Sequence, residues 1–221
     1  FAACDELGAR VSRIGLVTRA VALARARPAV FAATERVGVL LPPCVAAAAT
    51  NLAILFAGRC IVNLNFTVGV DGLRSAARQS QLRHVVTSRA FLERAKITLP
   101  DDVEPVFLED IAATIGAAAR LCAAVTALLL PAPWLERFCG RREATTVDAI
   151  ATVIFSSGST AEPKGVQLSH FNLDSNLRGL AQVFRPQRED VVLGSLPLFH
   201  SFGFLTLWFG TPARARADCC R

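Results

Sequence analysis

The chain has 221 residues, of which 52% are hydrophobic and 19% charged, and its formal net charge is +6. This composition supports one large domain or two small ones with a buried core, and it excludes a disordered chain. The basic residues are scattered, with no run of five and no interleaved aromatic residues, so no nucleic-acid binding is expected.

The apolar pattern alternates between expected helices and expected strands along the chain. Gly58 is placed to end the second helix, and Asp71 and Ser88 are placed to cap the third and fourth. The expected helices cover Arg13–Arg27, Cys44–Ala57, Gly72–Leu82, Arg89–Ala95, Glu109–Ala119, Leu121–Leu130 and a segment with Leu173, Leu177, Leu180 and Phe184 on one face. The expected strands cover Val37–Leu41, Cys60–Leu64, His84–Thr87, Pro105–Leu108, Ala151–Phe155 and Gly165–Ser169.

This alternation predicts an α/β fold with a largely parallel sheet flanked by helices. Ligands of such sheets usually bind beyond the carboxyl ends of the strands. No signal peptide and no transmembrane helix are predicted. The apolar segment Leu121–Leu130 has ten residues and ends at Pro131, too short to span a bilayer, and a buried helix is favoured there over an interfacial one.

The seven cysteines have irregular spacing and form no C-x-x-C pair. An odd number without a disulfide framework indicates reduced thiols and therefore a cytoplasmic protein. His84, His170 and His200 do not pair with cysteines at ligand spacing, so no zinc site is predicted. The chain begins at Phe1 and contains no methionine, from which we expect a fragment of a longer protein.

The strand expected at Ala151–Phe155 leads into a loop that reads S-S-G-S-T-A-E-P-K-G over residues 156–165. Small residues let backbone N–H groups approach an anion, hydroxyls add donors, and Lys164 adds a positive charge. Among 24 basic residues only Lys96 and Lys164 are lysines, so a lysine in this loop indicates a need for a compact point charge. The loop therefore predicts a polyphosphate site.

The loop does not follow the Walker pattern G-x-x-x-x-G-K-[ST]. Gly165 follows Lys164 instead of preceding it, and no hydroxyl residue follows the lysine. No G-x-G-x-x-G opens a helix, so a dinucleotide-binding fold is not expected either.

The segment S-S-G-S-T-A-E-P-K-G-V over 156–166 resembles the signature [ST]-S-G-[ST]-T-G-x-P-K-G-V of the adenylate-forming superfamily. Leu196–His200 with Gly203 resembles a second family segment, L-P-x-F-H-x-x-G. Three further segments are similar to those of acyl-[acyl carrier protein] synthetases and 2-acylglycerophosphoethanolamine acyltransferases, a branch of the superfamily that has long-chain acyl-CoA synthetases as neighbours. They are V-N-L-N at 62–65, T-S-R-A-F-L at 87–92 and F-H-S-F-G at 199–203.

The resemblance implies a two-step ligase. A fatty acid carboxylate attacks ATP to give acyl-AMP and pyrophosphate, and a thiol of CoA or of acyl carrier protein phosphopantetheine then takes the acyl group. Mg²⁺ accompanies the ATP, and Thr160 would help to place it, unless its hydroxyl only bonds the loop backbone. His200 would lie near the carboxylate, as the candidate catalytic residue, unless it is structural; His84 and His170 are expected to be structural or surface residues. The implied nucleotide-binding residues are Ser156, Ser157, Gly158, Ser159, Thr160, Lys164 and Gly165.

Two departures from the family pattern are expected to matter. Ala161 stands where the pattern has glycine, and alanine there would cost about 1 kcal/mol if the backbone needs a positive φ, which would weaken ATP binding. The adenine-binding segments, a magnesium-binding glutamate and the C-terminal domain of the family lie downstream of this chain, so we expect residues 1–210 to form an incomplete adenylation domain without activity of its own.

The last eleven residues, 211–221, lose all periodicity, and we expect a non-native or disordered tail there. The alternative to a ligase fragment is a degenerate, non-catalytic protein that binds nucleotide phosphate or a partner. The parent enzyme is expected in the cytoplasm, with peripheral membrane contact.

Overall fold

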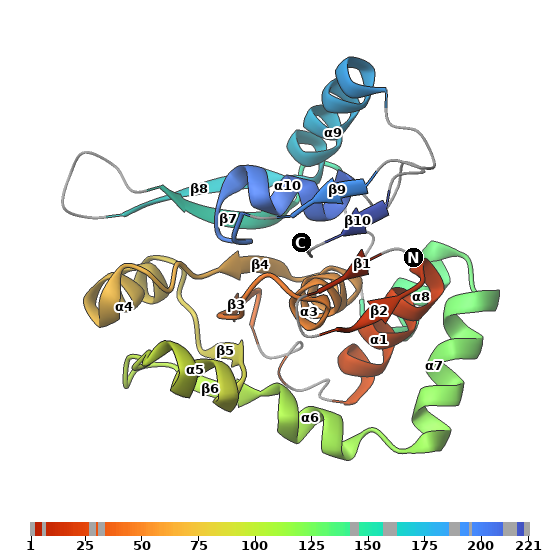
Figure 1. The fold of residues 1–221 in the computed structure, drawn as a ribbon, viewed down its shortest axis with the longest axis horizontal. Helices are drawn as coiled ribbons and strands as arrows, with labels where there is room; N and C mark the ends of the chain where they lie inside the picture. The colour runs from red at the N-terminus through yellow and green to blue at the C-terminus, as the bar shows by residue number, and fades with distance from the viewer. Residues whose placement is uncertain are drawn as a thin grey trace.

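The computed structural model describes residues 3–5, 8–26, 30, 34–141, 146–156, 163–185, 191–194, 196–209 and 216–218. In these residues a six-stranded sheet lies among helices, and a four-stranded sheet forms beside it from short strands (Figure 1). The α/β fold that the sequence predicts is therefore confirmed.

The six-stranded sheet has the strand order β6-β5-β3-β4-β7-β8. All neighbours are parallel except β8, which runs antiparallel to β7 and closes one edge of the sheet. Each expected strand of the sheet is present with similar bounds. The strands are β3 (Arg36–Val39), β4 (Cys60–Asn63), β5 (His84–Thr87), β6 (Glu104–Phe107), β7 (Ile150–Ser156) and β8 (Lys164–Ser169).

Two apolar clusters lie on the two faces of this sheet, because neighbouring strand residues point to opposite faces. In β4, the buried Ile61 belongs to the cluster under α1 and α3, whereas the buried Val62 packs with Leu73 of α4. The helices are α1 (Arg13–Ala26), α3 (Val45–Phe56), α4 (Gly69–Gln79), α5 (Arg89–Ala95), α6 (Leu108–Thr114), α7 (Ala117–Leu129), α8 (Ala132–Phe138), α9 (His170–Phe184) and α10 (Ser201–Phe209).

The helix ends agree with two of the three expected caps. Ser88 accepts a hydrogen bond from the backbone N–H of Phe91 at the start of α5, and Gly58 follows the end of α3 with a φ of +71°. Asp71 is not a cap: α4 begins two residues earlier, at Gly69, and the Asp71 carboxylate lies in its first turn. There it pairs with Arg74 at 2.9 Å.

The segment after β6 differs from its prediction in two respects. The helix expected over Glu109–Ala119 is two helices, because α6 ends at Thr114 and the extended Gly116 precedes α7. The buried helix expected at Leu121–Leu130 is largely exposed, since only Ala123 and Thr126 of α7 are buried, against α1. The ten-residue run held too few polar residues to reveal which side would face solvent.

In the described part of the chain, no single helix has the length and apolar character needed to cross a membrane. The pair α6 and α7 passes that test only when both are taken together, and the two helices are bent by 95° at their break.

The four-stranded sheet has the order β2-β1-β10-β9. Its strands are β1 (Ala3–Cys4), β2 (Arg10–Val11), β9 (Val191–Leu193) and β10 (Arg216–Asp218). β10 pairs in parallel with both β1 and β9, which brings the two ends of the chain side by side. The rest of 211–221 lies outside the described residues, so the predicted non-native tail, like the boundary at residue 210, stays a prediction.

A buried pair of amides joins α3 to the end of β4. Asn63 donates from its side-chain nitrogen to the Asn51 carbonyl oxygen at 2.9 Å, and Asn51 donates in return at 3.3 Å and to the backbone oxygen of Ala47 at 2.8 Å. Both asparagines are buried, so each amide depends on the other for its hydrogen bonds. The first asparagine of the V-N-L-N segment is therefore a structural residue.

We expect Asn63→Ala to lower the free energy of unfolding by about 2–3 kcal/mol, because it leaves the buried Asn51 amide without its partner. Urea unfolding followed by circular dichroism measures this loss. Asn65→Ala is the matched control, since Asn65 forms only a local turn by accepting bonds from Thr67. Equal losses in the two variants would contradict the structural role of Asn63.

Candidate functional site

The predicted phosphate loop connects two antiparallel strands. Ser156 ends β7 and Lys164 begins β8, and the two residues are register partners at the open end of this hairpin. The intervening candidates Ser157, Gly158, Ser159 and Thr160, and the variant Ala161, lie outside the described residues. A Walker loop leads from a strand into a helix, whereas this loop leads into β8, in agreement with its exclusion on the residue pattern.

Lys164 is exposed at the start of β8, and it takes part in no ion pair among the described residues. Its side chain shares a strand face with Val166 and Leu168, because every second residue of a strand points the same way. A cation at the loop end and an apolar wall thus lie on one face of the hairpin.

Gly165 is explained by its cross-strand partner Phe155. A Cβ atom on Gly165 would lie 3.1 Å from the Phe155 ring and 3.1 Å from the side chain of Val153. Any side chain at this position would displace the ring that covers the glycine, so the glycine after Lys164 permits close packing of the two strands.

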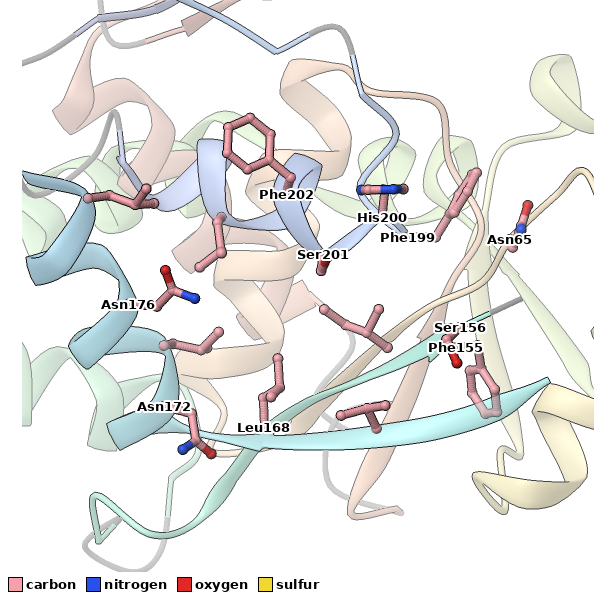
Figure 2. A pocket seen from close by; sticks show the side chains of 15 residues that line it. Asn65, Phe155, Ser156, Leu168, Asn172, Asn176, Phe199, His200, Ser201 and Phe202 are labelled. Atoms are coloured by element: carbon pink, nitrogen blue, oxygen red, sulfur yellow. The ribbon is translucent and has the colours of Figure 1, made fainter. Parts of the chain in front are cut away.

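A cavity of about 650 Å³ lies between this hairpin, α9 and α10. Figure 2 shows His200 and Ser201 on the α10 side of the cavity, with Phe155 and Ser156 across from them on the strand side. None of the described lining residues is Asp, Glu, Lys or Arg. The lining consists of Asn65, Ile154, Phe155, Ser156, Val166, Leu168, Asn172, Leu173, Asn176, Leu180, Phe199, His200, Ser201, Phe202 and Leu205.

His200 stands in the turn just before α10. Its backbone N–H donates to the Pro197 carbonyl oxygen at 3.0 Å, and its own carbonyl oxygen accepts from the Phe204 N–H at 2.8 Å. The structure thus places the predicted residues Ser156 and His200 in the lining of one cavity, with Lys164 as the cross-strand partner of Ser156.

Three aromatic rings support the His200 turn. Phe199 makes an edge-to-face contact with Phe66 at 5.0 Å between ring centroids, and Phe66 makes a second with Phe91 of α5 at 5.3 Å. Phe66 was not predicted from the sequence, because its contacts join segments that are far apart along the chain. Its position directly after the V-N-L-N segment was the only signal.

Gly203 explains the last position of the second family segment. It is buried in the first turn of α10, directly against the turn that precedes the helix. A Cβ atom there would lie 2.7 Å from the Leu196 carbonyl oxygen and closer still to that of Pro197. Only glycine lets α10 approach the Leu196–Phe199 turn this closely, so Gly203 sets the distance between the helix and this turn.

The downstream end of the phosphate loop is tied to α4. The Gln79 side chain donates to the Pro163 carbonyl oxygen at 2.9 Å and is in turn placed beside Ser75, to whose hydroxyl it donates at 3.1 Å. Pro163 precedes Lys164, so α4 holds the backbone next to the candidate phosphate ligand.

We expect Gln79→Leu to weaken triphosphate binding by about threefold to tenfold, the loss that follows when one hydrogen bond that orders a loop is removed. Calorimetric titration with tripolyphosphate measures it. The neighbouring Gln81→Leu is the control, because Gln81 is exposed and its backbone N–H donates to the Arg78 carbonyl oxygen at the end of α4. Unchanged affinity in the Gln79 variant would show that α4 does not order the loop.

The other two histidines lie away from the cavity. His84 pairs with Glu104 across β5 and β6 at 3.3 Å. His170 begins α9, where burial lowers its pKa and the positive charge of Arg141 lowers it further. A lowered pKa favours the neutral imidazole at neutral pH, which suits a packed position.

No group of three His, Cys, Asp or Glu side chains that could hold a metal ion occurs in the described ranges. The predicted metal contact of Thr160 lies outside them and stays a prediction. Cys44, Cys60, Cys122 and Cys139 are free thiols. Burial raises the pKa of Cys60 to about 11 and that of Cys139 to about 12, so these thiols are unreactive.

The fold and the hairpin site define a class of enzyme. The sequence matches the family described as AMP-binding enzyme over residues 16–219, and the chain belongs to this family. Enzymes of this family use ATP and Mg²⁺. The family assignment made from the two motifs is therefore confirmed.

Individual relatives differ in what their names say they act on. Long-chain-fatty-acid–CoA ligase 5 of Rattus norvegicus is 42% identical over 57 residues, which are 24% of this chain and 8% of the ligase. Pyochelin synthetase PchF of Pseudomonas aeruginosa is 29% identical over 182 residues, 82% of this chain and 9% of the synthetase. Each match thus spans less than a tenth of its relative's length.

Solved structures share the fold. VinN superposes with a TM-score of 0.74 at 20% identity, covering 98% of this chain and 51% of VinN. ATP-bound MatB from Rhodopseudomonas palustris superposes with a TM-score of 0.71 at 24% identity, covering 99% of this chain and 42% of MatB. The chain therefore has the fold of the N-terminal part of adenylate-forming enzymes and spans about half of these structures.

Proposed function

We propose that the chain is the N-terminal part of an ATP-dependent ligase that activates a fatty acid as acyl-AMP and passes it to a thiol. The observation that carries this proposal is the placement of Lys164 and the apolar cavity on one face of the β7–β8 hairpin. A ligase of this kind must hold a triphosphate and an acid side by side, and this hairpin offers a cation at its end and an apolar wall along its length.

Charge neutralisation and positioning supply most of the catalysis in such a reaction. In this proposal Lys164, Ser156 and the loop between them bind the β- and γ-phosphates, and Thr160 helps to place the Mg²⁺ that accompanies ATP. The metal neutralises charge on the phosphates when bound. His200 lines the cavity, where its imidazole can donate a hydrogen bond to the acid carboxylate.

The lining of the cavity favours a fatty acid over the other acids used in this family. An amino acid would need a carboxylate to pair with its ammonium group, and a dicarboxylate would need a second cation. The described lining contains neither. Leucine, isoleucine and phenylalanine side chains from β7, β8, α9 and α10 instead provide the surface that an acyl chain requires.

The acceptor in this proposal is CoA or the phosphopantetheine thiol of acyl carrier protein, and the location is the cytoplasm. The odd number and irregular spacing of the cysteines in the sequence support a reducing compartment. Relatedness to the acyl-[acyl carrier protein] synthetase branch rests on the segments at 62–65, 87–92 and 199–203. Peripheral contact with membranes would give such an enzyme access to its acyl substrate.

The proposed substrate class is tested by binding a fluorescent fatty acid to the chain as a probe and measuring which unlabelled acids displace it. We expect palmitate to displace the probe from the 221-residue chain at micromolar concentrations, and malonate and amino acids to leave it bound. Leu173→Asn, which replaces an apolar side chain of the lining with an amide, should weaken palmitate binding by about tenfold. Displacement by an amino acid, or no probe binding at all, would overturn the fatty-acid assignment.

A second measurement separates a ligase fragment from the degenerate alternative. The chain alone is expected to bind Mg-ATP but to release no pyrophosphate with ATP and palmitate. Pyrophosphate release would show that residues 1–221 are sufficient for adenylation. Nucleotide binding without any acid binding would favour the non-catalytic alternative.

A further inference from the structure

The outer side of α7 and the start of α8 form an exposed apolar surface. Leu121, Leu128 and Leu129 of α7 are 67%, 64% and 69% exposed, and Trp134 of α8 is 65% exposed. Figure 1 shows α7 at the edge of the molecule, with α1 on its inner side. Over residues 121–135 the sequence contains no charged residue. We call this region, residues 121–134, the α7–α8 surface.

An apolar surface of this extent costs free energy in water unless something covers it. Scattered single leucines need no explanation, but here the exposed side chains follow one another along one helix and into the next. The segment is too short to cross a bilayer, and its helix lies along the surface of the domain rather than pointing out of it. This arrangement is typical of a helix that lies in a membrane interface.

Arginine side chains lie beside this surface. Two cavities, of about 480 and 320 Å³, flank the contact between α1 and α6–α7. Their only charged lining residues are arginines: Arg19 and Arg120 in the first and Arg25 in the second. The one acidic residue of α8, Glu136, is paired with Arg141.

We infer that the α7–α8 surface docks on an anionic lipid bilayer, with the leucines and Trp134 in the acyl boundary and Arg19 and Arg120 at the headgroups. Tryptophan is suited to this depth, since its ring is apolar and its N–H can remain in contact with water. Arginines beside an apolar helix attract the negative surface of such a bilayer. This surface would make the membrane contact proposed above, and its binding to lipid does not depend on the binding of nucleotide or fatty acid.

Vesicle sedimentation of the 221-residue chain tests the docking. We expect binding to vesicles of phosphatidylcholine with one quarter phosphatidylglycerol, and at least tenfold weaker binding to phosphatidylcholine alone or in high salt. In the Trp208→Phe variant the fluorescence reports Trp134 alone, and its emission should shift to the blue with the anionic vesicles.

Two double variants, each with a matched control, distinguish vesicle binding through this surface from non-specific adsorption. Leu121→Gln with Leu128→Gln should weaken vesicle binding by at least tenfold, whereas Phe171→Gln with Val183→Gln, also exposed but on α9, should not. Arg19→Gln with Arg120→Gln should weaken binding to anionic vesicles by about tenfold, and Arg83→Gln with Arg94→Gln, an equal loss of charge elsewhere, by much less.

Light scattering on the same samples shows whether something other than a bilayer covers the α7–α8 surface. A dimer that is dissociated by Leu121→Gln with Leu128→Gln, without vesicle binding, would mean that a second copy covers the surface. A monomer that ignores vesicles would mean that another part of a longer protein covers it. Either result overturns the lipid assignment and leaves the fatty-acid and nucleotide measurements unaffected.

Discussion

Replacing Lys164 by glutamine is expected to weaken the binding of tripolyphosphate and of Mg-ATP to this chain by about tenfold to a hundredfold, the usual loss for one charge-assisted hydrogen bond. Glutamine keeps a polar side chain, shorter by one atom, and removes its charge. Because Lys164 begins β8 and is exposed, the substitution should leave the fold intact. Isothermal titration calorimetry measures the affinity, and thermal unfolding checks the fold.

The chain offers its own control for this experiment. Lys96 is the only other lysine, and it is exposed at the end of α5, away from the hairpin. Lys96→Gln changes the net charge by the same amount and should leave both affinities within a factor of two. If the two variants lose affinity equally, the phosphates respond to overall charge rather than to a site at Lys164. If neither variant changes, the loop does not bind phosphate through its lysine.

Substituting alanine for Gly203 is expected to lower the free energy of unfolding by about 1–3 kcal/mol, the range measured for overpacked interiors. The added methyl group would meet backbone carbonyl groups of Leu196 and Pro197, and backbone cannot move aside as a side chain can. Part of the strain should be relieved by a shift of the turn that carries His200, so palmitate binding should weaken as well.

Gly179→Ala is the matched control, because Gly179 lies in the middle of α9 with open space around it. Alanine is the better helix former by about 1 kcal/mol, so this variant should be more stable than the parent chain. Urea unfolding of both variants gives the two changes with opposite signs. A stable Gly203→Ala variant would contradict the close approach of α10 to the turn before it.

Much of the fold could be predicted because it depends on local pattern. The parallel strands read as short apolar runs, and Ser88 and Gly58 marked the ends of α5 and α3 by chemistry that acts within a few residues. The antiparallel direction of β8 could not be read in this way. A strand's direction depends on which neighbour it pairs with, and nothing within Gly165–Ser169 records that.

The candidate site was predictable only as far as its motifs extend. The residues at 156–166 and 196–203 identified the family and the ends of the cavity. Phe66 and Gln79 were missed because each acts through contact with a distant segment: Phe66 contacts Phe199, and Gln79 donates to Pro163. The exposed side of α7 was missed for a different reason: residues 121–130 are apolar except for Thr126, so they show no period from which a buried face could be chosen.

The antiparallel pairing of β7 and β8 also determines which changes of length the strand ladder can tolerate. Residues can be added between Ser156 and Lys164 without altering the ladder, because the added residues only enlarge the loop. A single residue added between Lys164 and Leu168 would instead turn the lysine and the apolar side chains to opposite faces of the strand. Lys164, Val166 and Leu168 follow one another at every second position, and this parity, more than the identity of any one apolar side chain, keeps the cation and the apolar wall on one face.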